Sequence, residues 1–210
     1  PKSKKMIGGA AISVKQINDE TMHMLELAYE NVSQAFGQLL QFSDKIDEQI
    51  YKREDTVNYL DKVISEYIST ALATPNLNVN ISQALSSYYL MLVDIERISD
   101  YAVNMNHQAT KRLQGDMTIS EIEIVEHMKK LCVDMKNDLS DVEEAERKDD
   151  VIDSLVSSWR EAQIQALKQQ KCSSEVSMML SRIFTDFERI NDHALNVSQE
   201  FDKINIEIPE

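Results

Sequence analysis

The stretch Asp94-Ile-Glu-Arg-Ile-Ser-Asp-Tyr-Ala-Val-Asn-Met105 returns, at an offset of 92 residues, as Asp186-Phe-Glu-Arg-Ile-Asn-Asp-His-Ala-Leu-Asn-Val197. Seven of the twelve positions are identical, and the acids, the Arg, the Ala and the Asn are among them. In each copy the Glu, the second Asp and the Asn stand at i, i+4 and i+8, which places them along one stripe of a helix. The repeat therefore predicts two copies of one helical unit, each with a candidate site.

The composition of the chain favours helices. Its 210 residues include only four Gly and three Pro, and aromatic residues make up 6%. Scarce turn formers and the lack of dense Val, Ile and Thr runs argue against a sheet. A hydrophobic share of 42% beside a charged share of 28% suits amphipathic helices with a shared core. We therefore expect an all-α fold of two tandem three-helix-bundle repeats, six helices in all.

Charge and cysteine content exclude several classes of protein. A formal net charge of −14 argues against nucleic acid as a partner, because a phosphate backbone is bound by clustered Lys and Arg. The same charge permits cation binding. Cys132 and Cys172 form no CxxC motif, so they predict free thiols in a reducing cytosol and no zinc site. No apolar run approaches the roughly 20 residues that cross a membrane.

The pattern along the chain divides it into two repeats. Apolar residues recur at three- and four-residue steps in six segments, with the clearest interruptions around Pro75 and Gly115. The repeats are expected at residues 19–113 and 118–203, after a linker at residues 1–18. The lysines of this linker fit either a flank next to a membrane or a charged terminal tail.

Three local features are expected within the helices. Asn80 with Gln83 and Thr118 with Glu121 have the spacing of capping boxes, in which the two residues bond each other's backbone N–H groups. Gly37 interrupts the first helical pattern. It predicts a bend or a close contact with a neighbouring helix.

Pairs of polar residues one turn apart occur on the second and third helix of each repeat. These are Glu96 with Asp100, Glu188 with Asp192, Asp149 with Asp153, and Glu54 with Asn58. Carboxylates at this spacing present several hard oxygen atoms to one point, and two such helices facing each other can hold metal ions. The alternative is that these acids form salt bridges and helix caps on solvated faces.

Other polar residues near these pairs are expected to have structural roles. Arg97 and Arg189 each have an Asp three residues earlier, Asp94 or Asp186, so a local ion pair is expected rather than anion binding. All four histidines, including His193 in the second copy of the repeat, are expected at the surface or rim.

Enzymatic activity is not expected. Glu20 and His23 form a single Glu-x-x-His motif, whereas a di-iron carboxylate enzyme needs two in the core of its bundle. The sequence has no Gly-rich phosphate loop and no G-x-S-x-G, and neither cysteine lies in a nucleophile motif.

These repeated phrases resemble those of the PhoU family, bacterial phosphate-signalling regulators built from two three-helix repeats. The family's acidic-Arg-Ile-x-Asp-x-Ala-x-Asn phrase is similar to residues 96–104 and 188–196. Its middle-helix phrase is similar to residues 54–60 and 149–155. The resemblance extends over residues 19–201, so it implies a PhoU-like fold for nearly the whole chain.

Members of this family bind multinuclear metal clusters through acid-xxx-Asp motifs. The resemblance implies metal ligands at Glu54, Glu96, Asp100, Asp149, Asp153, Glu188 and Asp192. Asn58 replaces the second carboxylate of one motif, so the first cluster is expected to bind more weakly or to hold fewer ions. Because these ligands offer oxygen atoms and no thiolate, Fe, Mn, Mg or Ca is favoured, and the choice among them stays open.

The start of the chain resembles, more narrowly, the cytoplasmic PhoU-like domain of Na⁺/phosphate cotransporter-family proteins. Residues 9–14 and 24–28 carry this likeness. It implies a regulatory domain of a sodium-dependent phosphate transporter, on the cytoplasmic side of the cell membrane, with a membrane-embedded transporter portion of the same chain as partner. The alternative is a free-standing PhoU-type adaptor that acts on a transporter and a sensor kinase. A homo-oligomer stays open in both cases.

Overall fold

Long α-helices account for nearly all of the described chain. The computed structural model describes residues 10–109 and 115–207, and within these ranges it contains six helices and no strand. The helices in chain order are α1 (Ala10–Leu40), α2 (Asp44–Leu72), α3 (Val79–Gln108), α5 (Ile119–Asn137), α6 (Val142–Lys168) and α7 (Ser174–Glu207). The all-α, six-helix prediction is confirmed.

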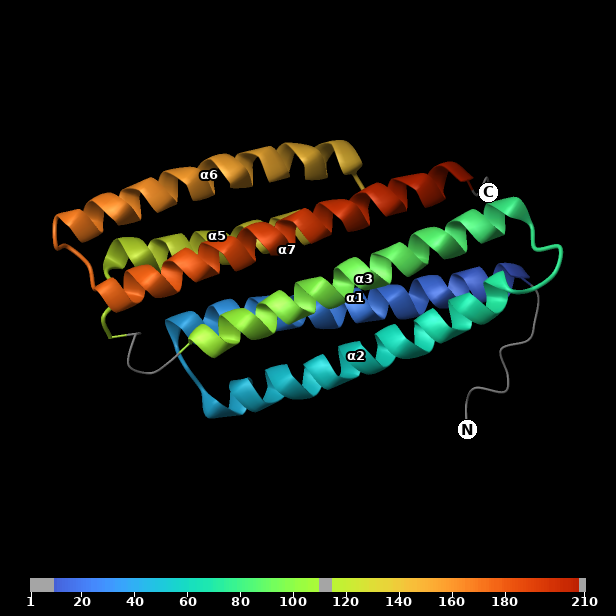
Figure 1. The fold of residues 1–210 in the computed structure, drawn as a ribbon, viewed down its shortest axis with the longest axis horizontal. Coiled ribbons are helices and arrows are strands. Elements are labelled where there is room, and N and C mark those ends of the chain that lie inside the picture. The colour runs from blue at the N-terminus through green and yellow to red at the C-terminus, as the bar shows by residue number, and fades with distance from the viewer. Residues whose placement is uncertain (1–9, 110–114, 208–210) are drawn as a thin grey trace.

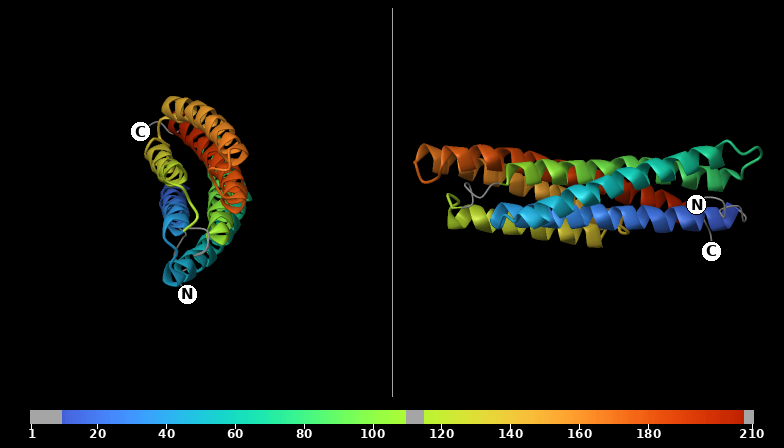
Figure 2. Two further views of the ribbon diagram at one scale, coloured as in Figure 1. Left: turned by 90° about the vertical axis from the view of Figure 1, so that its left-hand side faces the viewer. Right: turned by 90° about the horizontal axis from the view of Figure 1, so that it is seen from below.

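The helices are arranged in two layers along the long axis of the molecule (Figure 1). α6, α7, α3 and α2 lie side by side in one layer, and α5 and α1 form the other, as Figure 2 shows end-on. α1 packs on α2 and α3, and α5 packs on α6 and α7, so each half of the chain is a three-helix unit. This confirms the two tandem repeats.

The two units meet mainly through α3 and α7, which form the most extensive helix pair. These helices run antiparallel, so the α2–α3 and α6–α7 connections lie at opposite ends of the molecule (Figure 1). Ala102 and Ala194, equivalent residues of the two repeats, are fully buried. Small side chains at such positions let neighbouring helices approach closely.

An aromatic cluster joins the layers in the core. Phe36 of α1 and Phe187 of α7 are fully buried, and their rings meet edge to face with centroids 6.3 Å apart. Trp159 of α6 lies 6.2 Å from Phe187. Burial of one such side chain contributes about 2–3 kcal/mol to the free energy of unfolding. Apolar side chains from helices of both repeats thus pack into one shared core.

The local predictions had mixed outcomes. The Thr118–Glu121 capping box is confirmed, because Thr118 N–H donates to Glu121 Oε2 at 2.8 Å and Glu121 N–H donates to Thr118 Oγ1 at 3.3 Å. The Asn80 cap is wrong, since α3 begins one residue earlier and Asn78 accepts the N–H of Asn80 instead. The α1 helix continues through Gly37, where an added Cβ would meet nothing within 4 Å, so no close contact explains this glycine.

The start of the chain is more helical than expected. α1 begins at Ala10, so residues 10–18, expected as a linker, belong to the first helix. The lysines before Met6 lie outside the described residues. Within the described ranges, no helix combines the length and apolar character that a membrane crossing requires.

Candidate functional site

The acids of the first repeat meet where α2 faces α3. We call Glu54 and Asp61 of α2, together with Glu96 and Asp100 of α3, the first carboxylate group. Burial raises the pKa of Glu54, a hydrogen bond donated by the Ser99 hydroxyl opposes this shift, and the charge of Asp100 adds to it. The fold therefore brings the predicted residues Glu54, Glu96 and Asp100 to one side of the α2–α3 pair.

Asp61 belongs to this group although the sequence analysis did not select it. Burial raises the pKa of Glu96 to about 7, and the charges of Asp100 and Asp61 add to the shift while that of Arg97 opposes it. Burial also raises the pKa of Asp61 itself. Its position in the sequence could have identified it, because Asp61 follows Glu54 by seven residues. That spacing is two turns, which places both acids on one face of the helix.

A buried hydrogen-bond network fixes the position of Glu54. Asn31 of α1 is fully buried and donates to Ser99 Oγ at 3.4 Å and to the Ile50 carbonyl at 3.3 Å. Its own oxygen accepts a hydrogen bond from Arg53 Nη1 at 2.8 Å. Because Ser99 in turn donates to Glu54, α1 holds α2 and α3 in register at the site.

The acids of the second repeat meet where α6 faces α7. We call Asp149 and Asp153 of α6, together with Glu188 and Asp192 of α7, the second carboxylate group. Burial raises the pKa of Asp149 to about 6, and the charges of Asp153 and Asp192 add to it. The pKa of Asp153 is raised by burial and then by Asp192 and Glu188. All four predicted residues thus lie within electrostatic reach of one another.

The second carboxylate group has a cation of its own. Arg160 of α6 donates to Glu188 Oε2 at 3.0 Å, and it also donates to Thr185 Oγ1 and to the Ser181 carbonyl. The middle helices align at an offset of 95 residues, so the equivalent residue of the first repeat is Ser65. The first group therefore has no counterpart of this arginine, so less positive charge balances the negative charge of its acids.

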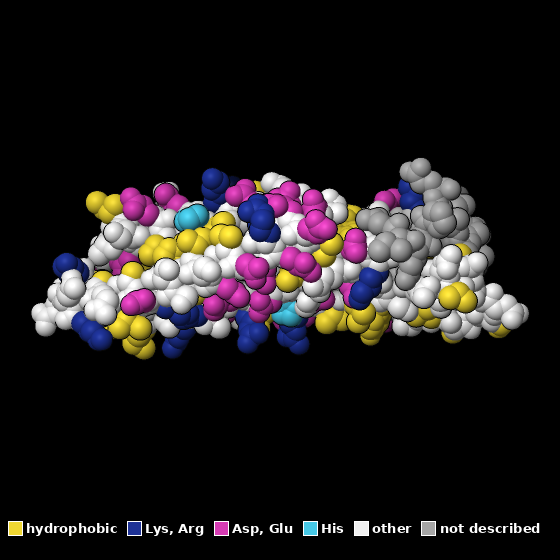
Figure 3. Space-filling model, turned by 90° about the horizontal axis from the view of Figure 1, so that it is seen from above, with side chains coloured by type: hydrophobic (Ala, Val, Ile, Leu, Met, Phe, Trp, Pro, Cys, Tyr) yellow, Lys and Arg dark blue, Asp and Glu magenta, His cyan; other side chains and the backbone are white. Residues whose placement is uncertain are grey.

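Both groups offer the oxygen donors that hard metal ions prefer. Figure 3 shows Asp and Glu side chains gathered around the middle of the face that carries α6. Among the described residues, no three His, Cys, Asp or Glu side chains lie close enough together to hold a metal ion. The raised pKa values of Glu96 and Asp149 reflect repulsion and desolvation that a bound cation would relieve. The type of donor atom therefore fits a hard cation, whereas the spacing of the described side chains is too wide to hold one in this arrangement.

The arginines next to the acids pair forward along the helix, not backward. Arg97 Nη1 lies 3.2 Å from Asp100 Oδ2, and Arg189 Nη1 lies 3.5 Å from Asp192 Oδ2. The prediction that these arginines pair with Asp94 and Asp186 at i−3 is therefore wrong. Each arginine nevertheless forms a local ion pair on its own helix. Both arginines thus contribute positive charge at the edges of the carboxylate groups.

One histidine lies between the repeats. His23, His107 and His127 are exposed, as expected, but the side chain of His193 is only 23% exposed. Its Nδ1 donates to Asp94 Oδ1 across the α3–α7 contact at 2.7 Å. Asp94 is therefore engaged by the other repeat, which explains why Arg97 does not pair with it.

Known proteins resemble this chain along most of its length. The PhoU domain model matches residues 21–109 and 119–201. The phosphate-specific transport system accessory protein PhoU homolog 1 of Thermotoga maritima is 23% identical over 196 residues, with 88% of this chain and 83% of that protein covered.

Two solved structures share the fold. PhoU from Pseudomonas aeruginosa superposes with a TM-score of 0.81 at 18% identity, over 92% of this chain and 97% of that one. The phosphate transport system regulatory protein PhoU from Streptococcus pneumoniae superposes with a TM-score of 0.80 at 19% identity, over 94% and 97%. Since the PhoU domain model matches both three-helix repeats, this chain belongs to the PhoU family.

Proposed function

We propose that this protein is a non-enzymatic regulator of a phosphate transport system. It acts as a PhoU-type adaptor on a transporter and a sensor kinase, at the cytoplasmic side of the cell membrane. The main support is the PhoU match across both repeats, together with the alignment over 83% of an accessory protein of a phosphate-specific transport system. That alignment favours an adaptor over the narrower expectation of a domain within a sodium-dependent transporter.

Gene deletion tests this function. Phosphate uptake by host cells is measured at high and at low external phosphate, with and without the gene. We expect the deletion to abolish the response of uptake to external phosphate, and we expect a plasmid copy to restore it. Unchanged regulation in the deletion strain would show that the protein has another role.

The two carboxylate groups are proposed as sites for Fe, Mn, Mg or Ca. A bound cation would supply the positive charge that lets the acids of facing helices ionise together, and would thereby hold α2 against α3 and α6 against α7. The ligands in the first group are Glu54, Glu96 and Asp100, joined by Asp61. The ligands in the second are Asp149, Asp153, Glu188 and Asp192.

Metal analysis tests these sites apart from transport. Protein purified without chelator is examined by elemental analysis, and stripped protein is titrated with Mn²⁺ and Ca²⁺ by calorimetry. We expect the double substitution Glu188→Ala and Asp192→Ala to abolish binding at the second group only. The matched control is Glu143→Ala with Glu146→Ala, which removes two acids of α6 outside the group. Absence of metal and of binding in the unaltered protein would make the acids structural.

A further inference from the structure

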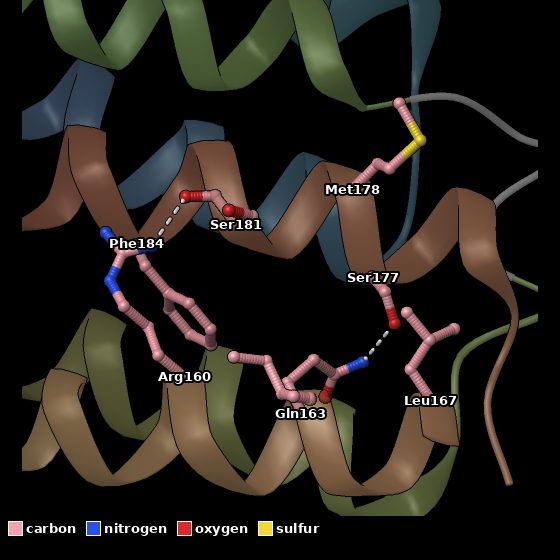
Figure 4. Close-up of a pocket in the computed structure, with 8 residues that line it drawn as sticks. Arg160, Gln163, Leu167, Ser177, Met178, Ser181 and Phe184 are labelled. Atoms are coloured by element: carbon pink, nitrogen blue, oxygen red, sulfur yellow. Dashed lines mark hydrogen bonds between the residues drawn. The ribbon is translucent and has the colours of Figure 1, made fainter. Parts of the chain in front are cut away.

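Pairs of buried polar side chains bond one another inside each three-helix unit. In the first unit, Asn31 Nδ2 donates to Ser99 Oγ at 3.4 Å. In the second unit, Gln163 Nε2 donates to Ser177 Oγ at 2.8 Å beside the pocket between α6 and α7, as Figure 4 shows. Such pairing is the rule in folded proteins, because a buried polar atom without a partner lowers stability. At these positions each unit satisfies its own polar groups.

Four buried polar atoms without a partner lie on helices of different units. Among the described residues, five buried side-chain atoms have no hydrogen-bond partner within the protein, and one of these, Asn106 Oδ1, belongs to α3. The other four are Thr21 Oγ1 and Tyr29 Oη on α1, and Asn191 Oδ1 and Ser198 Oγ on α7. Because α1 is part of the first unit and α7 is part of the second, each unit contributes two of these four atoms.

Helix geometry places these four atoms on the sides of α1 and α7 that face each other. The rings of Phe36 on α1 and Phe187 on α7 meet with centroids 6.3 Å apart, which marks the facing sides. The two α7 residues follow Phe187 by four and eleven positions, and the two α1 residues precede Phe36 by seven and fifteen, so each set shares a helix face with its phenylalanine. Because α1 and α7 run antiparallel (Figure 1), both sets extend in the same direction from the rings. The unpaired atoms of one helix therefore lie opposite those of the other.

Tyr29 and Asn191 lie near one thiol of α5 and have complementary roles. Asn191 Nδ2 lies 3.8 Å from Cys132 Sγ, and all three side chains are buried. Burial raises the pKa of Tyr29 well above its usual range, and the charge of Cys132 adds to this shift, so the hydroxyl keeps its proton and is a donor. Asn191 Nδ2 donates to the Phe187 carbonyl at 2.8 Å, which leaves Asn191 Oδ1 as an acceptor. An unpaired donor and an unpaired acceptor in one buried region are groups that an ordered water can bridge.

We propose that ordered water bridges α1 to α7, with one molecule between Tyr29 Oη and Asn191 Oδ1 and another between Thr21 Oγ1 and Ser198 Oγ. A water molecule both accepts and donates, so it accepts the hydrogen bond of the Tyr29 hydroxyl and donates one to Asn191 Oδ1. Buried waters typically make about three hydrogen bonds, and the Cys132 thiol offers the third. Polar atoms that would each lower stability alone thus tie the two repeats together. This inference goes beyond the proposed function and depends neither on metal nor on a transport partner.

The sign of a stability change tests each bridge. If water accepts from the Tyr29 hydroxyl, Tyr29→Phe leaves that water with one partner fewer, and the equilibrium constant for unfolding should rise about fivefold in urea denaturation. Thr21→Val replaces a hydroxyl by a methyl group at the second bridge and should act in the same direction. Tyr59→Phe, at a residue 66% exposed, is the control and should change nothing. If a hydroxyl has no partner in solution, its removal lowers the unfolding constant, and that result overturns the bridge at its position.

A double-mutant cycle tests whether Tyr29 and Asn191 share one water. Asn191→Leu keeps a similar volume and removes the acceptor. In that background the effect of Tyr29→Phe should shrink from about fivefold to less than about twofold, because the shared water is already lost. Tyr88→Phe is the matched control, since the Tyr88 hydroxyl donates to Asn18 Oδ1 at 2.9 Å on the α1–α3 side, and its effect should multiply with that of Tyr29→Phe. Effects of Tyr29→Phe and Asn191→Leu that simply multiply overturn the shared water.

Direct observation separates a water bridge from a direct bond, and it stands even if a variant fails to fold. In a high-resolution crystal structure of the unaltered protein, we expect one water within about 2.7–3.2 Å of both Tyr29 Oη and Asn191 Oδ1. In solution, ¹⁷O relaxation dispersion should count about one long-lived water fewer in Tyr29→Phe than in the unaltered protein. A direct hydrogen bond from Tyr29 to Asn191, or no water between them, overturns the proposal. Phosphate uptake in the deletion strain tests the proposed function separately, so the two failures are distinct.

Discussion

His193 Nδ1 lies 2.7 Å from Asp94 Oδ1, and this polar contact joins the two repeats near the middle of the α3–α7 pair. Asn196 Nδ2 donates to the same oxygen at 3.0 Å. Tyr101 stacks on the His193 ring with centroids 5.9 Å apart. Two residues of the second repeated phrase thus donate to Asp94, whose side chain is only 15% exposed, and Tyr101 of the first phrase packs on one of them.

Asp94→Ala removes both hydrogen bonds to this carboxylate. The donors His193 Nδ1 and Asn196 Nδ2 then lack this acceptor at the interface between the repeats. We expect the free energy of unfolding to fall by about 2 kcal/mol, the usual range for hydrogen bonds to a charged group. Urea denaturation followed by circular dichroism measures it. An equal loss from His193→Ala, with no further loss in the double variant, would assign the effect to this pair. Full stability of Asp94→Ala would show that the contact is not formed in solution.

Asp186 is the equivalent of Asp94 in the second repeat, and we expect the opposite effect there. Burial raises its pKa to about 6, and within the described residues it has no hydrogen-bond donor of the kind that Asp94 receives from His193. A raised pKa means that ionisation opposes folding, so the associated stability is present at low pH and is lost as the pH rises through about 6. Asp186→Asn should therefore stabilise the protein at pH 8 by roughly 1 kcal/mol after allowance for solvent screening. Destabilisation at pH 8 would contradict this.

Glu96 should make the metal-free protein more stable in mild acid. Its pKa rises from 4.5 to about 7, because burial and the neighbouring acids oppose its charge. Stability is therefore fully present below about 4.5 and is lost as the pH rises through about 7. In chelator, Glu96→Gln should raise the free energy of unfolding at pH 8 by roughly 1–2 kcal/mol and flatten the dependence between pH 5 and pH 8. Glu66→Gln, at an exposed position of α2, is the control and should change neither.

The helical architecture was predictable because its causes are local and periodic. The three- and four-residue spacing of apolar side chains gives six helices, and the repeated phrase gives two equivalent units. The Thr118 box was predictable for the same reason, since its two residues lie within one turn. The predicted helix cap at Asn80 was two residues too late, because Asn78 caps α3 instead. Helix starts are hard to place to within one or two residues, and here two nearby asparagines can both act as a cap.

The candidate site was only partly predictable, because its electrostatics depend on which helix faces meet. Arg160 and Glu188 are 28 residues apart in sequence, and no local spacing links them. Asp94 and His193 are separated by 99 residues. Local reasoning assigned Asp94 to Arg97, but a donor from the other repeat holds it instead. The acidic motifs themselves were found because repetition marks them without any knowledge of packing.

Arg160 sets the last expectation, the relative strength of the two carboxylate groups. Asn58 in place of a carboxylate suggested a weaker first group, but Asp61 adds an acid there, whereas Arg160 places a cation on Glu188 in the second. A guanidinium at 3.0 Å competes with a metal ion for the same carboxylate. Arg160→Gln should therefore raise the affinity of the second group for Mn²⁺ about tenfold in calorimetric titration. Arg147→Gln is the matched control, because that arginine of α6 pairs with Glu144 outside the group. The competition is refuted if both variants bind Mn²⁺ as the unaltered protein does, or if Arg147→Gln alone gains affinity.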